Sequence, residues 1–176
     1  GILRSQVERC KEALSVISAS AGAGRAESGH RMPVDAYLDE VINEWQTQRP
    51  EARLALDFTA TDTHSEIIAE RTLSQALIKV LNNAADASPQ DISISGNWSG
   101  DTLNLEIADR GPGLSRDVHE QLGKAPVSTK SEGLGVGLYL AHATIERLGG
   151  SLEIADRDQG GTTVQITLPL LEAAAV

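Results

Sequence analysis

The chain has 176 residues, 40% of them hydrophobic and only 3% aromatic, which is enough for one domain with a core of aliphatic side chains. Its formal net charge of −10 at pH 7 excludes nucleic acid or an anionic membrane as a partner of the whole surface, but not a local phosphate site. The single cysteine, Cys10, excludes an internal disulfide and fits a reducing compartment. No stretch is long enough to span a membrane and no signal peptide is evident. Because the first residue is not Met, we expect a fragment of a longer protein.

The first twenty residues carry a heptad pattern, in which apolar residues recur at spacings of four and three and predict a helix with one apolar seam. The seam residues are Leu3, Val7, Cys10, Leu14 and Ile17. So short a heptad repeat is not stable as a coiled coil alone. We therefore expect residues 1–20 to be the end of a longer helix and the glycine-rich residues 21–30 to be a linker.

Residues 31–171 are predicted to form one α/β domain, followed by a tail at 172–176. The predicted helices span 35–48, with Asp35 as N-cap, then 72–87 and about 138–148. The predicted strands span 32–34, 53–59, 92–94, 103–107, 152–154 and 164–168, with tight turns at 99–101 and 158–161. Strands clustered late in the chain, with helices between them, indicate a two-layer sandwich in which helices cover one face of a mixed sheet.

The predicted helix at 72–87 has an apolar face and a polar stripe. The apolar face consists of Leu73, Leu77, Val80, Leu81 and Ala84, and the stripe of Gln75, Lys79, Asn82, Asn83 and Asp86. Every amphipathic helix has a polar face, so contact with solvent is one interpretation. The paired asparagines favour another, because Asn is a poor helix former and a carboxamide oxygen is a good Mg²⁺ ligand beside phosphates.

Asp109 continues the core-facing row of the strand at 103–107, where a carboxylate is costly unless it is paired. An acceptor-only group fits the exocyclic amino group of adenine. The alternative is that the strand ends at Ala108 and Asp109 merely begins a turn. Gly111 and Gly113 follow at once and permit a sharp turn and close approach to a ligand.

A second glycine cluster, Gly133, Gly135 and Gly137, stands just before the last predicted helix, whose first amides can bind an anion. Lys130 lies three residues upstream, well placed for a terminal phosphate. Loop punctuation and a solvated lysine are the alternatives, and a Rossmann motif is disfavoured because no strand precedes these glycines. Thr162 opens the last strand, either as part of a simple hairpin or as a contact under a nucleotide.

In this order the elements resemble the ATP-binding catalytic domain of sensor histidine kinases, in the superfamily that also holds gyrase, Hsp90 and MutL. Residues 81–86 look like the N box, 109–113 like the G1 box, 128–130 like the tail of the F box and 133–138 like the G2 box. The resemblance covers roughly residues 30–170 and implies a Bergerat-type sandwich that holds ATP and Mg²⁺ under a lid at about 114–134.

The resemblance also implies roles for single residues. Asn83 would ligate Mg²⁺, and Asn83 and Lys130 would be the catalytic residues. The nucleotide contacts would come from Asn83, Asp86, Asp109, Gly111, Gly113, Lys130, Gly133, Gly135, Val136, Gly137, Leu138 and Thr162.

The chain departs from the family pattern at two positions. Lys79 stands where the family has a second Asn and where gyrase-like relatives carry a catalytic Glu, so hydrolysis by a base on this helix is disfavoured. Three interpretations of Lys79 are open: it replaces metal charge near the phosphates, it weakens Mg²⁺ binding, or it is an introduced change. The F box lacks its usual Phe, since residues 125–127 are Ala, Pro and Val.

None of the four histidines has the sequence context of a phosphoacceptor, so we expect the accepting His upstream of this chain, on a dimerisation hairpin of a homodimer. The resemblance implies a response regulator receiver domain as partner, no nucleic acid, and a cytoplasmic location in an inner-membrane sensor kinase whose membrane part precedes residue 1. Residues 3–10 look like a segment of RegB/PrrB-type redox-responsive kinases, in which a cysteine here is regulatory. On a heptad seam, Cys10 would face its symmetry mate, although most unpaired cysteines are simply small buried hydrophobes.

Overall fold

The computed structural model describes residues 29–60, 64–114 and 135–171. The predicted helix at 1–20 with Cys10, the linker up to residue 28, Lys130, Gly133 and the tail at 172–176 lie outside the described residues. No helix within the described ranges is both long enough and apolar enough to cross a membrane.

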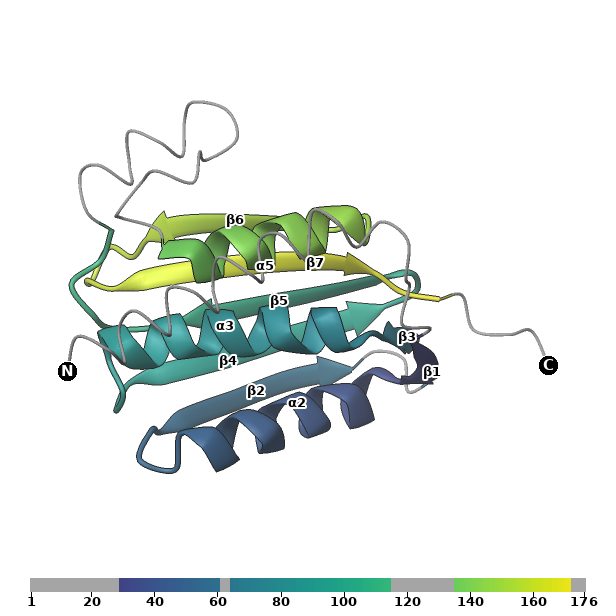
Figure 1. Cartoon of the computed structure of the whole chain (residues 1–176), viewed down its shortest axis with the longest axis horizontal. Coiled ribbons are helices and arrows are strands. Elements are labelled where there is room, and N and C mark those ends of the chain that lie inside the picture. The colour runs from purple at the N-terminus through teal and green to yellow at the C-terminus, as the bar shows by residue number, and fades with distance from the viewer. Residues whose placement is uncertain (1–28, 61–63, 115–134, 172–176) are drawn as a thin grey trace, which may run out of the picture.

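Five strands form one mixed sheet (Figure 1). Their order in space is β2 (Leu54–Ala60), β4 (Ile92–Ser99), β5 (Thr102–Ala108), β7 (Thr162–Pro169) and β6 (Ser151–Asp156). β2 and β4 are parallel, and the other neighbours are antiparallel. A separate antiparallel pair joins β1 (His30–Pro33) to β3 (Glu66–Ala69).

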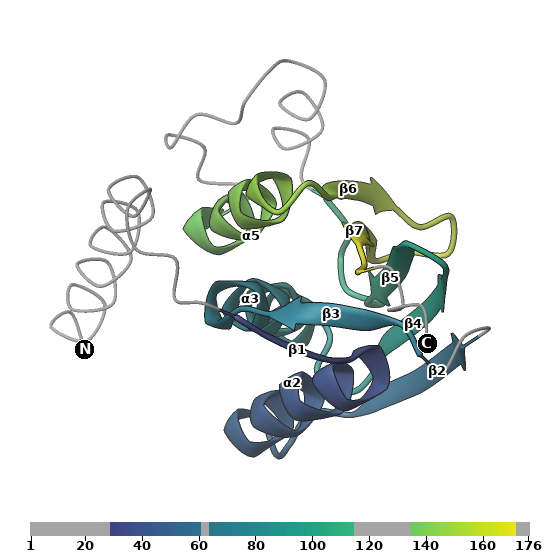
Figure 2. The ribbon, with the colours of Figure 1, turned by 90° about the vertical axis from the view of Figure 1, so that its right-hand side faces the viewer.

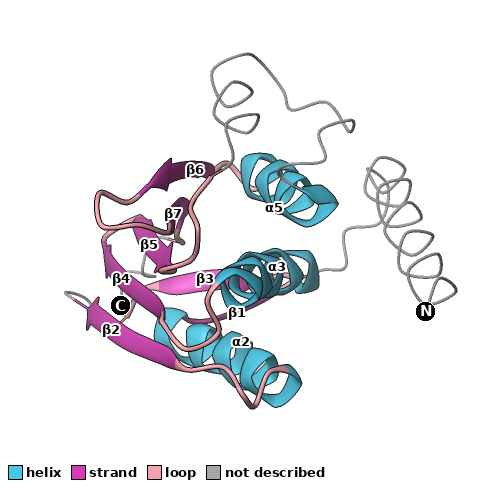
Figure 3. Cartoon of the chain, turned by 90° about the vertical axis from the view of Figure 1, so that its left-hand side faces the viewer, coloured by secondary structure: helices cyan, strands magenta, loops and turns pink. Residues whose placement is uncertain are grey.

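The helices of the described residues all cover the same face of this sheet, as Figures 2 and 3 show from opposite sides. They are α2 (Val34–Gln48), α3 (Arg71–Ala87) and α5 (Gly135–Arg147). The predicted two-layer α/β sandwich, with a mixed sheet covered on one face, is therefore confirmed.

The core lies between the two layers because both kinds of element show their expected periodicity. β4 and β5 alternate, so that their inward row is apolar and their outward row is polar. All five predicted apolar positions of α3 are buried. Burying each large aliphatic side chain contributes about 1.5–3 kcal/mol, so this row and helix face together define which side of the sheet the helices cover.

Two hydrogen bonds tie the buried face of α2 to α3, one from Ser74 to Tyr37 and one from Trp45 to Asn82. Tyr37 and Trp45 are both buried there, as the spacing predicts. The Ser74 hydroxyl donates to the Tyr37 hydroxyl oxygen at 3.2 Å. Burial raises the pKa of the Tyr37 phenol above its ordinary value, so the group stays protonated in the fold.

One expectation for the first part of the domain is wrong, and one strand was not predicted. Asp35 is not the N-cap, because α2 begins at Val34 with Pro33 in the capping position and no side-chain cap. The Val34 amide instead donates to the Ser65 carbonyl at 3.1 Å, which satisfies a donor that a cap would otherwise serve. Strand β3 was not predicted at all, and it is only four residues long.

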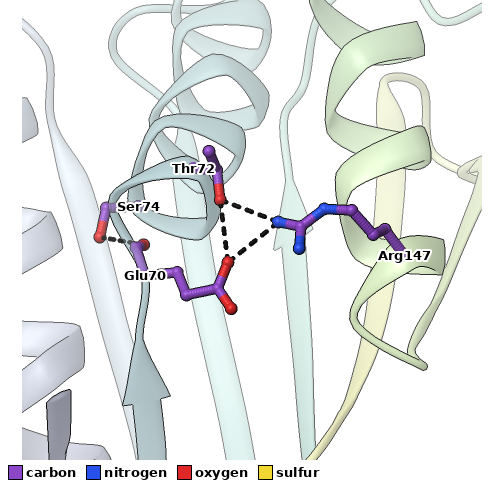
Figure 4. Close-up of polar contacts among 4 residues, drawn as sticks. All are labelled: Glu70, Thr72, Ser74 and Arg147. Carbon is purple, nitrogen blue, oxygen red and sulfur yellow. Dashed lines mark hydrogen bonds and ion pairs between the residues drawn. The ribbon is translucent and has the colours of Figure 1, made fainter. Parts of the chain in front are cut away.

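α3 and α5 are antiparallel, and a polar cluster joins the N-terminus of α3 to the C-terminus of α5 (Figure 4). The Arg147 guanidinium donates to Glu70 Oε2 at 2.9 Å and to Thr72 Oγ1 at 3.0 Å. Arg147 ends α5 whereas Glu70 precedes α3, so the start of α5 lies toward the C-terminal half of α3. The ion pair is partly exposed and contributes at most about 1 kcal/mol, but it shows the direction of both helices.

Candidate nucleotide site

Asp109 comes directly after β5 and is only 4% exposed. Its backbone amide donates to the Thr162 carbonyl at 3.0 Å. Its Oδ1 accepts from the amides of Gly111 at 2.7 Å and Thr162 at 3.3 Å. The strand does end at Ala108, as the alternative expected, yet the carboxylate is buried and paired. Both bonds that the side chain accepts from described residues end on Oδ1, which leaves Oδ2 to accept from a ligand.

The turn between β6 and β7 holds both ends of the loop at 109–114. At its start, the Arg157 guanidinium donates to the Asp109 carbonyl at 3.0 Å. At its end, Asp156 Oδ1 accepts from the Leu114 amide at 2.7 Å. Neither Arg157 nor Asp156 was predicted. The available signal was the hairpin register, since Thr163 pairs with Ala108 and so brings residues 156–162 to the same end of the sheet as Asp109.

Three glycines are required by the space around this loop. Gly161 has φ +95°, and a Cβ there would overlap the Asp109 carbonyl oxygen. Gly113 has φ +79°, and its Cβ would lie 2.9 Å from Asp156 Oδ1. At Gly111 a Cβ would lie 2.7 Å from the Ala87 Cβ, so the loop packs against the end of α3. Gly111 and Gly113 therefore permit the loop to pack closely against Ala87 and Asp156, and their approach to a ligand stays a prediction.

The paired asparagines of α3 have different surroundings. Asn82 Oδ1 accepts from the Trp45 indole Nε1 at 3.1 Å, so this oxygen holds α2 and α3 together. Asn83, one residue on, is exposed. The structure thus separates a structural Asn from one that is available to a ligand.

Asp86 has a partner within the protein. Its Oδ1 accepts a hydrogen bond at 2.7 Å from the guanidinium of Arg49, the residue that follows α2. The carboxylate is nevertheless 66% exposed, so it remains reachable beside Asn83. Lys79 is half-buried on the same helix.

The second glycine cluster is described only in part. Gly135 begins α5, and Val136 follows it in the first turn, so both contribute backbone amides at the helix N-terminus. No described atom lies within 4 Å of a Cβ built on Gly137. The Leu138 side chain is buried in the core, and Thr162 is also buried.

The donor set fits an adenine nucleotide with Mg²⁺. A buried carboxylate oxygen is left for an amino group, an exposed carboxamide lies in the C-terminal half of α3, and the N-terminus of α5 offers amides that attract phosphate. Within the described ranges no three His, Cys, Asp or Glu side chains gather into a metal site. Mg²⁺ typically takes one or two protein ligands and completes its shell with phosphate oxygens and water, so a single Asn fits this mode.

Comparison with known proteins identifies the class. A profile of the family described as "Histidine kinase-, DNA gyrase B-, and HSP90-like ATPase" matches residues 68–172. The chain therefore belongs to this family, which confirms the predicted ATP-binding domain of the histidine kinase type. The RegB/PrrB-type assignment gains no support from this match.

Relatives of the chain include sensor histidine kinase ZraS of Escherichia coli K12, which is 33% identical over 120 residues, 66% of this chain and 26% of ZraS. The C4-dicarboxylate transport sensor protein DctS of Rhodobacter capsulatus is 34% identical over 114 residues, 61% of this chain and 17% of DctS. The chain thus spans about a quarter or less of the length of these relatives.

Among solved structures, Acinetobacter baumannii histidine kinase AdeS aligns with a TM-score of 0.65 at 22% identity, covering 98% of this chain and 83% of AdeS. The catalytic domain of histidine kinase ThkA aligns with a TM-score of 0.62 at 19% identity, covering 80% of this chain and 96% of that structure. At these identities the likeness shows the fold alone.

Proposed function

We propose that this chain is the ATP-binding catalytic domain of a two-component sensor histidine kinase. The whole protein would transfer the γ-phosphate of ATP to a His on its own dimerisation domain, and from there to an Asp of a response regulator receiver domain. The buried Asp109, with Oδ1 saturated by two amides and Oδ2 left over, is the observation that carries this proposal.

Asp109 would read the adenine base. Its Oδ2 accepts a hydrogen bond from the exocyclic amino group, and Thr162 beside it completes the wall of the base pocket. The glycines at 111 and 113 bring the backbone close to the nucleotide. This part of the site supplies binding and orientation.

Asn83, Lys130 and the first amides of α5 would hold the phosphates. Mg²⁺, when bound with ATP, neutralises charge on the phosphate oxygens. Asn83 offers an exposed carboxamide oxygen to the metal, and Gly135 and Val136 offer backbone amides to the anion. Asp86, Gly133, Gly137 and Leu138 belong to the same proposed set, with Leu138 contributing through its backbone because its side chain lies in the core.

Phosphoryl transfer in this arrangement depends on positioning and electrostatics. α3 carries Lys79 where a gyrase-type enzyme carries its catalytic Glu, so the base and the acceptor would come from the dimerisation domain. Residues 1–20 would be the end of that domain's second helix, 21–30 a linker and 31–171 the catalytic unit. The domain would work in the cytoplasm, with the membrane part of the sensor kinase upstream.

Replacing Asp109 by Asn is expected to weaken ATP binding by at least about tenfold, because a charged acceptor is lost from a buried contact. Titration of the 176-residue chain with ATP in the presence of Mg²⁺ measures this effect. Asp39→Asn, a change at an exposed carboxylate on α2, is the control and should bind ATP normally. Normal ATP binding by the Asp109→Asn variant would refute the proposal.

Redox control through Cys10, as in RegB/PrrB-type kinases, is a second proposal. It is supported by the position of Cys10 on the heptad seam, where two copies of a parallel dimer would bring the thiols together. Oxidation of the whole protein is then expected to produce a disulfide-linked dimer on a non-reducing gel and to change kinase activity. A Cys10→Ser variant that responds to oxidant like the native protein would eliminate the idea.

A further inference from the structure

Arg157 reaches from the β6–β7 turn to the base-reading residue. It is half-buried, and its guanidinium donates to the Asp109 carbonyl oxygen at 3.0 Å. Its own backbone is tied down at both ends of the turn, since its amide donates to the Gly161 carbonyl and its carbonyl accepts from the Gly160 amide, each at 3.0 Å. The guanidinium of Arg157 therefore extends from a turn whose backbone is fixed by hydrogen bonds.

The hydrogen bond from Arg157 adds to three others that fix the position of Asp109. The Asp109 amide is bound to Thr162, and its Oδ1 is bound to the amides of Gly111 and Thr162. Arg157 adds the carbonyl oxygen, and its guanidinium is the one charged donor among these groups. Hydrogen bonds from charged donors are stronger than those between neutral groups. Because the amide, the carbonyl oxygen and Oδ1 of Asp109 are all hydrogen-bonded, the direction in which Oδ2 points is fixed.

Arg157 lies between two hollows of opposite charge. One, of about 290 Å³, places it among the carboxylates of Glu106, Glu153, Asp156 and Asp158. The other, of about 410 Å³, is lined by Arg157 together with Arg53 and Arg110, and Asp91 is the carboxylate of that lining. Three guanidinium groups on one hollow repel each other, although solvent screens the effect. The hydrogen bond to the Asp109 carbonyl gives Arg157 a specific role that the exposed Arg53 lacks.

We propose that Arg157 is a positioning residue that sets the base selectivity of the nucleotide site through Asp109. This inference rests on the proposed function, because it assumes that Asp109 reads the base. Adenine presents an amino donor to Oδ2, whereas hypoxanthine, the base of ITP, presents an oxygen at that position. A carboxylate that cannot move away repels that oxygen, and a loosened one tolerates it.

The test is the ratio of ATP to ITP affinity, measured by titration of the 176-residue chain with each nucleotide in the presence of Mg²⁺. Arg157→Met, which keeps an unbranched stem but has no donor, is expected to lower the ratio by about tenfold, because ATP loses a well-directed acceptor and ITP meets less repulsion. Arg157→Gln, which restores a neutral donor, should recover part of the ratio. Arg53→Met is the matched control, since it changes an arginine of the same hollow and should leave the ratio as it was.

A merely structural role predicts something else, namely an equal loss of affinity for both nucleotides together with a lower melting temperature. That result, or an unchanged ratio in Arg157→Met, would overturn the inference. Asp109→Asn keeps the two proposals apart. If Asp109→Asn binds ATP normally, the proposed function fails, whereas if it loses ATP binding and the Arg157 variants keep their ratio, only the positioning role fails.

Discussion

Replacing Gly161 by alanine is expected to lower the free energy of unfolding by about 3 kcal/mol and to weaken ATP binding sharply. Gly161 has φ +95°, where an L-residue is strained, and its new Cβ would overlap the Asp109 carbonyl oxygen. The overlap cannot be relieved by a side-chain rotation, because the obstructing atom is backbone. Urea unfolding and ATP titration of the same variant measure the two effects.

Gly160 provides the control because it lies in the same turn and has a similar φ of +88°, yet no atom of the described residues lies within 4 Å of its Cβ position. Gly160→Ala should therefore show only the backbone strain, about 1–2 kcal/mol, and should keep its affinity for ATP. Equal effects of the two substitutions on ATP binding would mean that the contact between Gly161 and Asp109 does not shape the site.

Alanine substitutions at Asn82 and Asn83 are expected to have opposite consequences. Asn82→Ala leaves the indole N–H of the fully buried Trp45 without its acceptor, which costs about 1–3 kcal/mol of stability. Asn83→Ala removes an exposed side chain, so stability should change by less than about 0.5 kcal/mol while the Mg²⁺-dependent part of ATP affinity is lost. Thermal unfolding, with ATP titration in Mg²⁺ and in EDTA, distinguishes the two outcomes.

Gln75→Ala is the matched control for this pair, since Gln75 is an exposed amide on the polar stripe of the same helix. It should alter neither stability nor the Mg²⁺ dependence. If Asn83→Ala binds ATP with the native Mg²⁺ dependence, Asn83 is not the metal ligand and the assignment of the two asparagines is wrong.

Periodic segments could be predicted from the sequence because their pattern is local. The apolar row of α3 repeats with the helical period and the rows of β4 and β5 repeat every second residue, so each pattern specifies both the element and its buried face. Asp109 could be singled out for the same reason, since it prolongs the buried row of β5. These features need no knowledge of distant residues.

The errors and omissions all depend on contacts between distant parts of the chain. β3 is four residues long and is defined by its pairing with β1, and the start of α2 is satisfied by Ser65, which lies next to β3. The hydrogen bond from Trp45 to Asn82 joins two helices, and the contact of Arg157 with Asp109 depends on the register of β5 with β7. No window of neighbouring residues contains that information.

The strand order has a further consequence for Asp109, the proposed base-reading residue. β5 is the middle strand of the sheet, with β4 on one side and β7 on the other, whereas β2 and β6 are its edges. Edge strands can fray at little cost, but opening a central strand breaks two ladders and exposes the core row beneath it. Asp109 is therefore attached to the part of the sheet that opens last, whereas Arg157 follows the edge strand β6, so fraying of β6 would release the Asp109 carbonyl while β5 stays paired with β4.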